Sequence, residues 1–284
     1  MKTIRILIAL FTISFFLFSF TSENENKNKN DLSKLKLKGK IKSLTETKFN
    51  AVENSGEIQK KGNYEYKNII VFNEKGNKIE ENLYNSDEIL YSKKTYIYDD
   101  KENKVEENSY NSYGSLDWKS ISRYDSTGNK AEDNIYRSAR GFDNRITYKY
   151  DDEGNEIESN FFKSDSSFNN KLTFKYDNKG NNIEMNSFKS DSSFDGKTIY
   201  KYDDNGNEME INSYKSDGSL GLKSDSKYDD KGNIIEKNTY KSDGSLDYIN
   251  TYKYDYDKTD NWIKKIIFRS GIPQEIIERE IEYY

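Results

Sequence analysis

The sequence contains no histidine, no cysteine and a single proline, Pro273. Without histidine, the chain lacks the usual general base, the Ser-His-Asp and Cys-His arrangements and the commonest zinc ligand. Without cysteine, it has no disulfide, no thiolate nucleophile and no cysteine metal site. These absences argue against an enzyme and predict a protein that works by binding or assembly.

Aliphatic residues are also scarce. Hydrophobic types make up 33% of the 284 residues, and tyrosine alone contributes 24 of them, so a compact globule with a large aliphatic core is not expected. The aromatic residues recur at fixed spacing, which favours a sheet held by cross-strand aromatic pairs over disorder. The net charge of −5 is mixed along the chain with no basic stripe, so nucleic acid is not an expected partner.

What the chain does have is a repeat of 26 residues, anchored by a tyrosine. The anchors are Phe72, Tyr98, Tyr124, Tyr150, Tyr176, Tyr202, Tyr228 and Tyr254. With the anchor counted as position 0, most units have Asp at +1, Gly at +4, Asn at +5, Glu at +8, Asn at +10, an aromatic residue at +12 and Leu or Phe at +18. The Asp-x-x-Gly-Asn segment predicts a turn, because Asp can accept bonds from the turn amides and Gly takes the positive φ.

A second turn, clearest at residues 216–219 and 242–245, divides each unit into two runs of strand length. The expected fold is all-β, an elongated antiparallel β-meander of tandem 26-residue β-hairpin repeats that forms a single-layer or curled sheet. Three-residue loops would place positions 0, +8, +10, +12 and +18 on one face and Lys149, Lys175 and Lys201 on the other. A two-residue loop at either turn would reverse that parity.

The first 22 residues differ from the rest. Lys2 and Arg5 precede an apolar run over residues 6–20, with small polar residues after it. This pattern predicts a signal peptide, with an uncleaved membrane anchor as the alternative. The mature protein is therefore expected to be exported and to be periplasmic, on the cell surface or secreted.

The remaining chain divides by composition and repeat register. The predicted parts are a disordered linker over 23–36, a divergent N-terminal β cap over 37–71, seven repeats over 72–253 and C-terminal capping hairpins over 254–284. The segment 255–261 reads as a turn that is two residues longer than those of the other units.

Regularly spaced aromatic residues predict a candidate polysaccharide track, because aromatic rings stack on sugars while Glu and Asn bond their hydroxyl groups. The candidate residues are Tyr110, Trp118, Tyr136, Tyr214, Tyr240, Tyr248, Glu210, Asn212, Glu236 and Asn238. The alternative is that these tyrosines only form the cross-strand ladder that holds the sheet together.

Metal and catalytic sites are not expected. Asp151, Asp203 and Asp255 open oxygen-rich turns of the kind calcium uses, but none matches the twelve-residue calcium loop, and turns favour Asp and Asn for their own geometry. A glycosidase would need one carboxylate pair, whereas the Glu at +8 recurs in every unit. No cofactor is predicted.

The segments Tyr150-Asp-x-x-Gly-Asn155, Tyr176-Asp-x-x-Gly-Asn181, Tyr202-Asp-x-x-Gly-Asn207 and Tyr228-Asp-x-x-Gly-Asn233 resemble the YD repeats of the Rhs family. The resemblance covers about two thirds of the chain. It implies a bacterial surface or secreted protein built from β-hairpin repeats, with carbohydrate binding in some members. The chain departs from that family in its longer period, its few repeats and its lack of a toxin domain.

These observations predict a non-enzymatic, exported YD-repeat protein that acts as a binding scaffold in the cell envelope. Its partner would be a glycan or another protein, with no stable membrane span once the signal peptide is removed. Two alternatives remain: a structural or assembly protein that pairs through its sheet edge, and an immunity-type protein that neutralises a toxin.

Overall fold

The computed structural model describes residues 30–284, so the predicted signal peptide over 1–22 lies outside the described residues. One short helix, α1 (Asp31–Lys34), precedes 18 strands. The strands are β1 (Ile41–Asn54), β2 (Glu57–Phe72), β3 (Lys78–Asn85), β4 (Leu90–Tyr98), β5 (Lys104–Asn111), β6 (Leu116–Tyr124), β7 (Lys130–Arg137), β8 (Gly141–Tyr150), β9 (Glu156–Lys163), β10 (Phe168–Tyr176), β11 (Asn182–Phe188), β12 (Phe194–Tyr202), β13 (Glu208–Lys215), β14 (Leu220–Tyr228), β15 (Ile234–Tyr240), β16 (Leu246–Tyr256), β17 (Trp262–Arg269) and β18 (Ile272–Tyr283). The predicted all-β class is confirmed.

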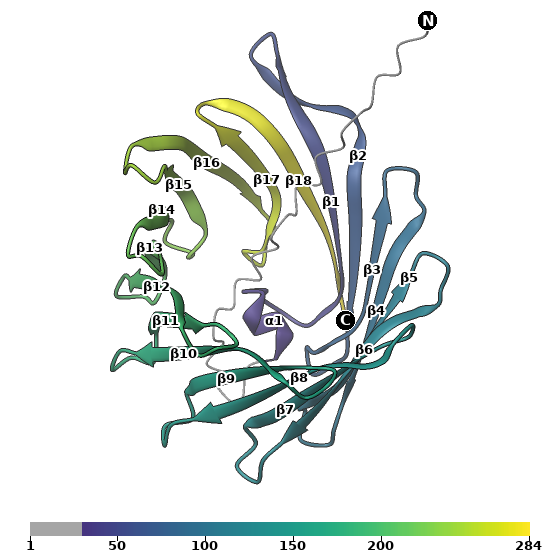
Figure 1. Cartoon of the computed structure of the whole chain (residues 1–284). Helices are drawn as coiled ribbons and strands as arrows, with labels where there is room; N and C mark the ends of the chain where they lie inside the picture. The colour runs from purple at the N-terminus through teal and green to yellow at the C-terminus, as the bar shows by residue number, and fades with distance from the viewer. Residues whose placement is uncertain (1–29) are drawn as a thin grey trace, which may run out of the picture.

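The strands form one closed antiparallel barrel (Figure 1). Each strand pairs with its neighbours in sequence, and β1 closes the ring by pairing with both β2 and β18. The prediction of an open, elongated or curled sheet is therefore wrong. Closure has a physical reason: strands twist in one direction, so a long regular meander curls, and joining its two ends pairs backbone groups that would otherwise be free edges.

The Asp-x-x-Gly-Asn segments form the turns at one end of the barrel. In the turn that starts at Asp203, the Asp203 amide donates to the Asn207 carbonyl at 2.9 Å, and the Gly206 amide donates to the Asp203 carbonyl at 3.1 Å. The Asp203 Oδ1 atom accepts from the amides of Asn205 and Asn207, as the sequence predicts. Gly206 has φ +80°, which explains the glycine at this position.

Each of these turns is accompanied by a β-bulge that changes which face a residue occupies. Tyr202 pairs with Glu208, but the preceding Lys201 pairs with Glu210, so Met209 is an extra residue in β13. A second bulge follows the other turn, where Gly221 is the extra residue in β14. A bulge reverses the alternation of the strand that carries it.

The two bulges place the anchor tyrosines on the inner face. The residues at +8, +10, +12 and +18 lie on the outer face, together with the lysines that precede the anchors. The predicted register, which put all five markers on one face and those lysines on the other, is therefore wrong. The inner face is identified by residues 30–40, which pack against it beside Leu44, Ile70 and Phe72.

The last unit also differs from its prediction. Tyr256 pairs with Trp262, and the Asp257 amide donates to the Asn261 carbonyl, so this turn has the same length as the others. The two additional residues lengthen β16, which has 11 residues where β14 has nine.

Residues 30–40, here called the strap, are ordered and lie across one mouth of the barrel (Figure 1). At one end, the Leu32 amide donates to the Gly76 carbonyl at 3.0 Å, and Asp31 accepts from the Tyr98 hydroxyl at 2.8 Å. Further along, the Lys36 ammonium donates to the Gly232 carbonyl at 3.1 Å. The disordered linker was predicted over 23–36. Residues 30–36 have a defined conformation here, and residues 23–29 lie outside the described residues.

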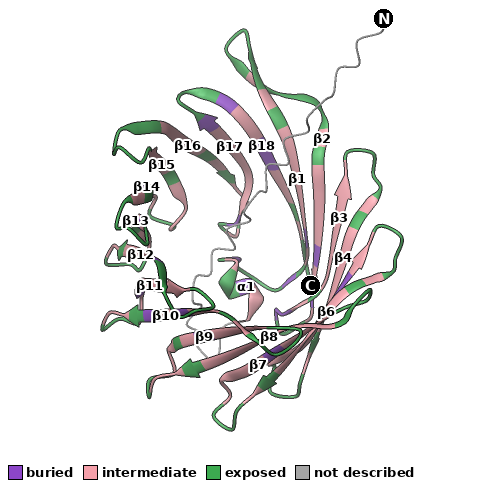
Figure 2. Ribbon diagram, viewed as in Figure 1, coloured by how far each residue is buried: buried purple, intermediate pink, exposed green. Residues whose placement is uncertain are grey.

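Buried residues are few and are scattered over several strands of the ring (Figure 2). The main cluster contains Leu32, Leu37, Ile41, Leu44, Ile70 and Phe72. Elsewhere, the extensive contacts between elements join only strands that are neighbours in the ring. Because an 18-stranded barrel is too wide for its own side chains to fill, the barrel encloses a lumen.

The hairpin of β1 and β2 extends beyond its neighbours. Strand β18 pairs with β1 only as far as Asn50, and β3 pairs with β2 only from Tyr66. Residues 51–61 therefore form a two-stranded ribbon that projects from the mouth opposite the strap (Figure 1).

Candidate binding site

The outer wall carries eight of the ten residues predicted to form the polysaccharide track. They are Tyr110, Tyr136, Tyr214, Tyr240, Glu210, Asn212, Glu236 and Asn238. The remaining two, Trp118 and Tyr248, lie on the inner wall, since their Cα partners Ser109 and Thr239 are inner residues. The structure therefore does not bring the predicted set together on one face.

The outer residues bond chiefly to one another. The Lys201 ammonium lies 3.0 Å from the Glu210 carboxylate, which also accepts a hydrogen bond from the Asn212 amide. Lys197 lies over the Tyr214 ring at 5.7 Å from its centroid. These hydrogen bonds from Lys201 and Asn212 hold the pKa of Glu210 below its usual value.

The next unit repeats this arrangement. Lys227 lies 2.9 Å from Glu236, Lys223 lies over the Tyr240 ring at 4.9 Å, and the Asn238 amide donates to Asp225 at 2.7 Å. The ladder interpretation therefore explains the outer residues well, because their charges and amides are occupied by neighbours on adjacent strands.

The inner wall is lined by columns of tyrosine. Five anchor hydroxyls donate to backbone carbonyls of the preceding hairpin, as from Tyr176 to Glu156 at 2.7 Å and from Tyr228 to Glu208 at 2.7 Å. Two residues before the anchor, Tyr148 donates to the Asp133 carboxylate at 2.6 Å. The register preferred from the sequence missed this wall because it kept regular alternation through the turns. The alternative, in which the parity reverses, was tied to two-residue loops, whereas the structure produces the reversal by bulges.

Trp118 and Tyr248 contact cations on the same inner wall. The Lys94 ammonium lies 5.5 Å from the Trp118 ring centroid, and the Arg269 guanidinium lies 4.6 Å from that of Tyr248. Both aromatic residues occupy the position six before the anchor of the next unit. At this position the side chain points into the lumen.

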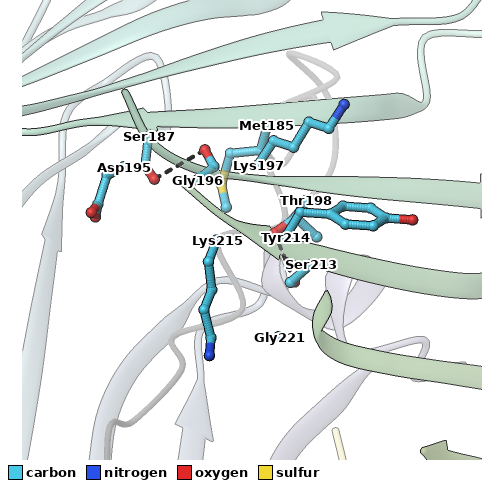
Figure 3. Close-up of a pocket in the computed structure, with 10 residues that line it drawn as sticks. All are labelled: Met185, Ser187, Asp195, Gly196, Lys197, Thr198, Ser213, Tyr214, Lys215 and Gly221. Atoms are coloured by element: carbon cyan, nitrogen blue, oxygen red, sulfur yellow. Dashed lines mark hydrogen bonds between the residues drawn. The ribbon is translucent and has the colours of Figure 1, made fainter. Parts of the chain in front are cut away.

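In one unit, the residue at that position has no side chain. Gly196 occupies it in β12, and a shallow pocket of about 240 Å³ lies beside it (Figure 3). Met185, Ser187, Thr198 and Ser213 line the pocket; Ser187 donates to the Gly196 carbonyl, and the Thr198 and Ser213 hydroxyls are 2.9 Å apart. The pocket is smaller than those that enclose drug-sized ligands, so it is a local recess in the lumen wall.

The inner wall is not uniform around the ring. From β17 through β1 to β7 it carries many charged residues, including Glu81, which accepts from the Tyr96 hydroxyl at 2.9 Å. From β8 to β16 the inner wall is rich in tyrosine, phenylalanine and small hydroxyl residues. Phe174 and Ser224 are two examples, and both are buried. A ligand in the lumen would therefore meet one aromatic side and one charged side.

Among residues 30–284, no group of three or more acidic side chains is arranged to hold a metal ion. Two of the three aspartates considered for calcium, Asp151 and Asp203, bond to their own turns, as when Asp151 accepts from the Asn155 amide at 2.7 Å and from its side chain at 2.9 Å. The third, Asp255, lies within β16 opposite Lys264 and does not open a turn as the sequence predicted. In the same part of the chain, the single helix is one turn long and falls far short of the length of a helical membrane span.

The geometry defines a wide, closed, antiparallel β-barrel with an ion-paired outer wall and a lumen lined by aromatic and polar residues. No family model and no curated protein matches the chain. Its resemblance to YD repeats therefore stays a prediction.

Several solved structures are similar at low identity. A porin-like protein from Bacteroides uniformis matches with a TM-score of 0.44 and 11% identity, covering 85% of this chain and 96% of that one. A putative outer membrane lipoprotein-sorting protein domain from Vibrio parahaemolyticus gives 0.28 and 12%, covering 88% and 89%. The Photorhabdus luminescens Tc holotoxin pore gives 0.29 and 11%, covering 81% of this chain and 14% of that one. These likenesses are too distant to carry a functional argument.

Proposed function

We propose that this chain is an exported, non-enzymatic binding protein of the cell envelope that takes a ligand into the lumen of its barrel. A carbohydrate is the ligand class that fits best. The observation that carries the proposal is the inner wall, where tyrosines, Trp118 and small hydroxyl residues face a space that the strands themselves do not fill. Aromatic faces and hydroxyl groups are the chemistry that holds sugars.

The lumen is a better candidate than the outer track predicted from the sequence. On the outer wall, charged partners cover the rings and occupy the polar atoms of residues such as Glu210 and Tyr214. A sugar would have to displace those contacts. In the lumen, Trp118 and Tyr248 also contact cations, Lys94 and Arg269, but the two rings lie near the mouth opposite the strap, where a ligand could enter.

The outer wall also favours a barrel that stands in an aqueous compartment. Ion pairs circle it, as between Lys149 and Glu158 at 2.6 Å and between Lys175 and Glu184 at 2.7 Å. A lysine on the lipid-facing side of a membrane barrel costs about 2–4 kcal/mol at the bilayer midplane. Export of the chain rests on the leader pattern of residues 1–22.

The test is a glycan-binding screen followed by two matched pairs of substitutions. Trp118→Ala with Tyr248→Ala removes inner rings, and Tyr110→Ala with Tyr240→Ala removes outer rings. We expect the inner pair to weaken binding by about tenfold or more, since stacking of one ring is worth about 1 kcal/mol. The outer pair should leave the affinity for the glycan unchanged. Circular dichroism checks that both pairs of variants are folded.

Two results would reject the proposal. One is a well-folded protein that binds no glycan in the screen. The other is binding that depends on the outer pair and ignores the inner pair, which would restore the track on the outer wall.

The edge-pairing alternative is now confined to the ribbon of residues 51–61. Closure pairs the remaining described strands on both sides, whereas this ribbon has both edges unpaired. An extended segment of a partner protein could pair there. Gln59→Pro would abolish such binding and leave glycan binding intact.

A further inference from the structure

An ionic cluster lies on the inner wall where the ring closes. It is built by four adjacent strands, β17, β18, β1 and β2, and Ile277 on β18 is the common Cα partner of Lys265 and Lys48. The charged members are Glu46, Lys48, Glu65, Lys265, Glu275 and Arg279. Lys265 lies near the middle of its strand, so the cluster is well inside the barrel.

Two of the three cations are paired with carboxylates. The Arg279 Nε atom donates to Glu46 at 3.1 Å. The Lys48 ammonium lies 2.7 Å from Glu275 and 3.2 Å from Glu65. Within residues 30–284, no carboxylate lies within ion-pair distance of the third cation, Lys265.

Lys265 is held instead against aromatic and apolar surface. Its ammonium lies 4.7 Å from the Trp262 ring centroid, and the Arg279 guanidinium lies 3.3 Å from the same centroid. Tyr254 on β16 is the Cα partner of Lys265, and the centroid of the Tyr254 ring lies 6.0 Å from that of the Trp262 ring. A cation–π contact only partly replaces the water that a buried ammonium loses.

The surroundings disfavour the charged form of this lysine. Burial lowers the pKa of Lys265 below its usual value, and Arg279 and Lys48 lower it further, while Glu46 and Glu275 act in the opposite direction. An anion placed beside the ammonium would supply the counter-ion that the wall lacks.

We propose that Lys265 is the docking point for a carboxylate group of the ligand, and that the ligand is an acidic sugar of the uronic acid class. The inference rests on the proposed function, since it places the sugar in the lumen. Tyr254 on β16 is the Cα partner of Lys265, and Tyr252 lies on the same inner face, so aromatic residues border the same position. The carboxylates Glu46 and Glu275 are held by Arg279 and Lys48, which limits their repulsion of the ligand.

The experiment compares trigalacturonate with its methyl ester, which has the same rings without the charge. Binding to the full-length protein is measured by calorimetry at neutral pH. We expect the acid to bind about tenfold more tightly than the ester, the effect of one charge-assisted hydrogen bond. Lys265→Met should abolish this preference, and Lys265→Arg should retain most of it.

Lys264→Met is the matched control, because the neighbouring lysine points to the outer wall and should leave the preference unchanged. The inference is overturned if acid and ester bind equally, or if Lys265→Met keeps the preference. Binding of neutral glycans without any effect at Lys265 would reject only the acidic-sugar inference. A folded protein that binds neither charged nor neutral glycans would reject the proposed function as well.

Discussion

The side chain of Asn261 bonds both backbone polar groups of Lys38. Its Oδ1 atom accepts from the Lys38 amide at 2.8 Å, and its Nδ2 atom donates to the Lys38 carbonyl at 2.8 Å and to the Tyr283 hydroxyl at 2.9 Å. In five other units the same asparagine donates to the aspartate of its own turn, as from Asn207 to Asp203 at 2.9 Å. In the last turn, Asp257 accepts from Tyr283 instead. A local turn residue thus joins the strap, the last turn and the C-terminal strand.

Asn261→Ala should therefore destabilise the barrel more than the same change in an ordinary unit. Asn261 is 2% exposed, and its removal eliminates its hydrogen bonds with the Lys38 amide, the Lys38 carbonyl and the Tyr283 hydroxyl, which together cost about 1–3 kcal/mol in the free energy of unfolding. Asn207→Ala is the control and should cost about 1 kcal/mol or less, because its partner remains close to solvent. Urea denaturation measures both, and equal losses would contradict the role assigned to Asn261.

The recess beside Gly196 leads to a second prediction. A Cβ atom at Gly196 would lie 2.6 Å from the backbone carbonyl oxygen of Tyr214, so Gly196→Ala requires β12 and β13 to separate. We expect a loss of about 1–3 kcal/mol in the free energy of unfolding, typical of overpacking. At Gly221, the nearest atom would be 3.5 Å away, so Gly221→Ala should change stability little. Similar losses at the two glycines would show that backbone approach does not explain Gly196.

The turn aspartates predict how stability depends on pH. Hydrogen bonds from the Asn207 side chain and amide lower the pKa of Asp203 below its usual value. The pKa of Asp125 is lowered in the same way by hydrogen bonds from Thr127 and from the Asn129 amide. A lowered folded-state pKa means that the stabilisation is complete above the unfolded-state pKa and is lost as pH falls through the folded value. The melting temperature should therefore fall as the pH is lowered from about 5 to 3.

Substitution separates the turn contribution from general acid effects. Asp203→Asn removes the titrating group while an oxygen acceptor remains, so the decline in melting temperature at acid pH should become shallower. Asp204→Asn, at the exposed next position, should leave the decline unchanged. An identical pH profile for Asp203→Asn and the unmodified protein would contradict the assignment.

The strands and turns could be predicted from the sequence because their causes are local. Asp203, Gly206 and Asn207 fix a turn by their own hydrogen bonds and φ preferences, wherever the turn lies. The outer ladder of Glu210 and Tyr214 was recognised for the same reason. Ring closure was missed because it depends on the accumulated twist of 18 strands and on strap contacts between residues as distant as Lys38 and Asn261.

The division of the candidate site between two walls could not be predicted because it depends on bulges. Met209 and Gly221 are the extra residues that reverse the alternation. Position +19, which Gly221 occupies, carries Asp, Asn or Tyr in the other units, so its residue type does not mark a bulge. Trp118 and Tyr248 were therefore grouped with outer residues. One signal was available: position +7, the bulged residue itself, is apolar in all seven units, as at Ile157 and Met209, although the residue that follows it is always Glu.

The strap provides the last prediction. Leu32 is buried against the barrel with Leu37, Ile70 and Phe72, so Leu32→Ala removes apolar contacts that hold the strap in the mouth. A buried Leu→Ala change costs about 2–5 kcal/mol where the surroundings cannot relax. Because the strap contacts only the rim and the adjoining wall, we expect this cost to appear as local release, with faster hydrogen exchange at the Leu32 and Leu37 amides.

The control for the strap is Leu246→Ala, which makes the same change at an exposed outer position. It should leave exchange at the strap unchanged, and both variants should leave the amides of β10 and β11 protected. Equal exchange at the strap in the two variants would show that Leu32 does not hold it. Loss of protection throughout the barrel after Leu32→Ala would instead show that the strap is part of the global folding unit, because release would then require opening of the ring.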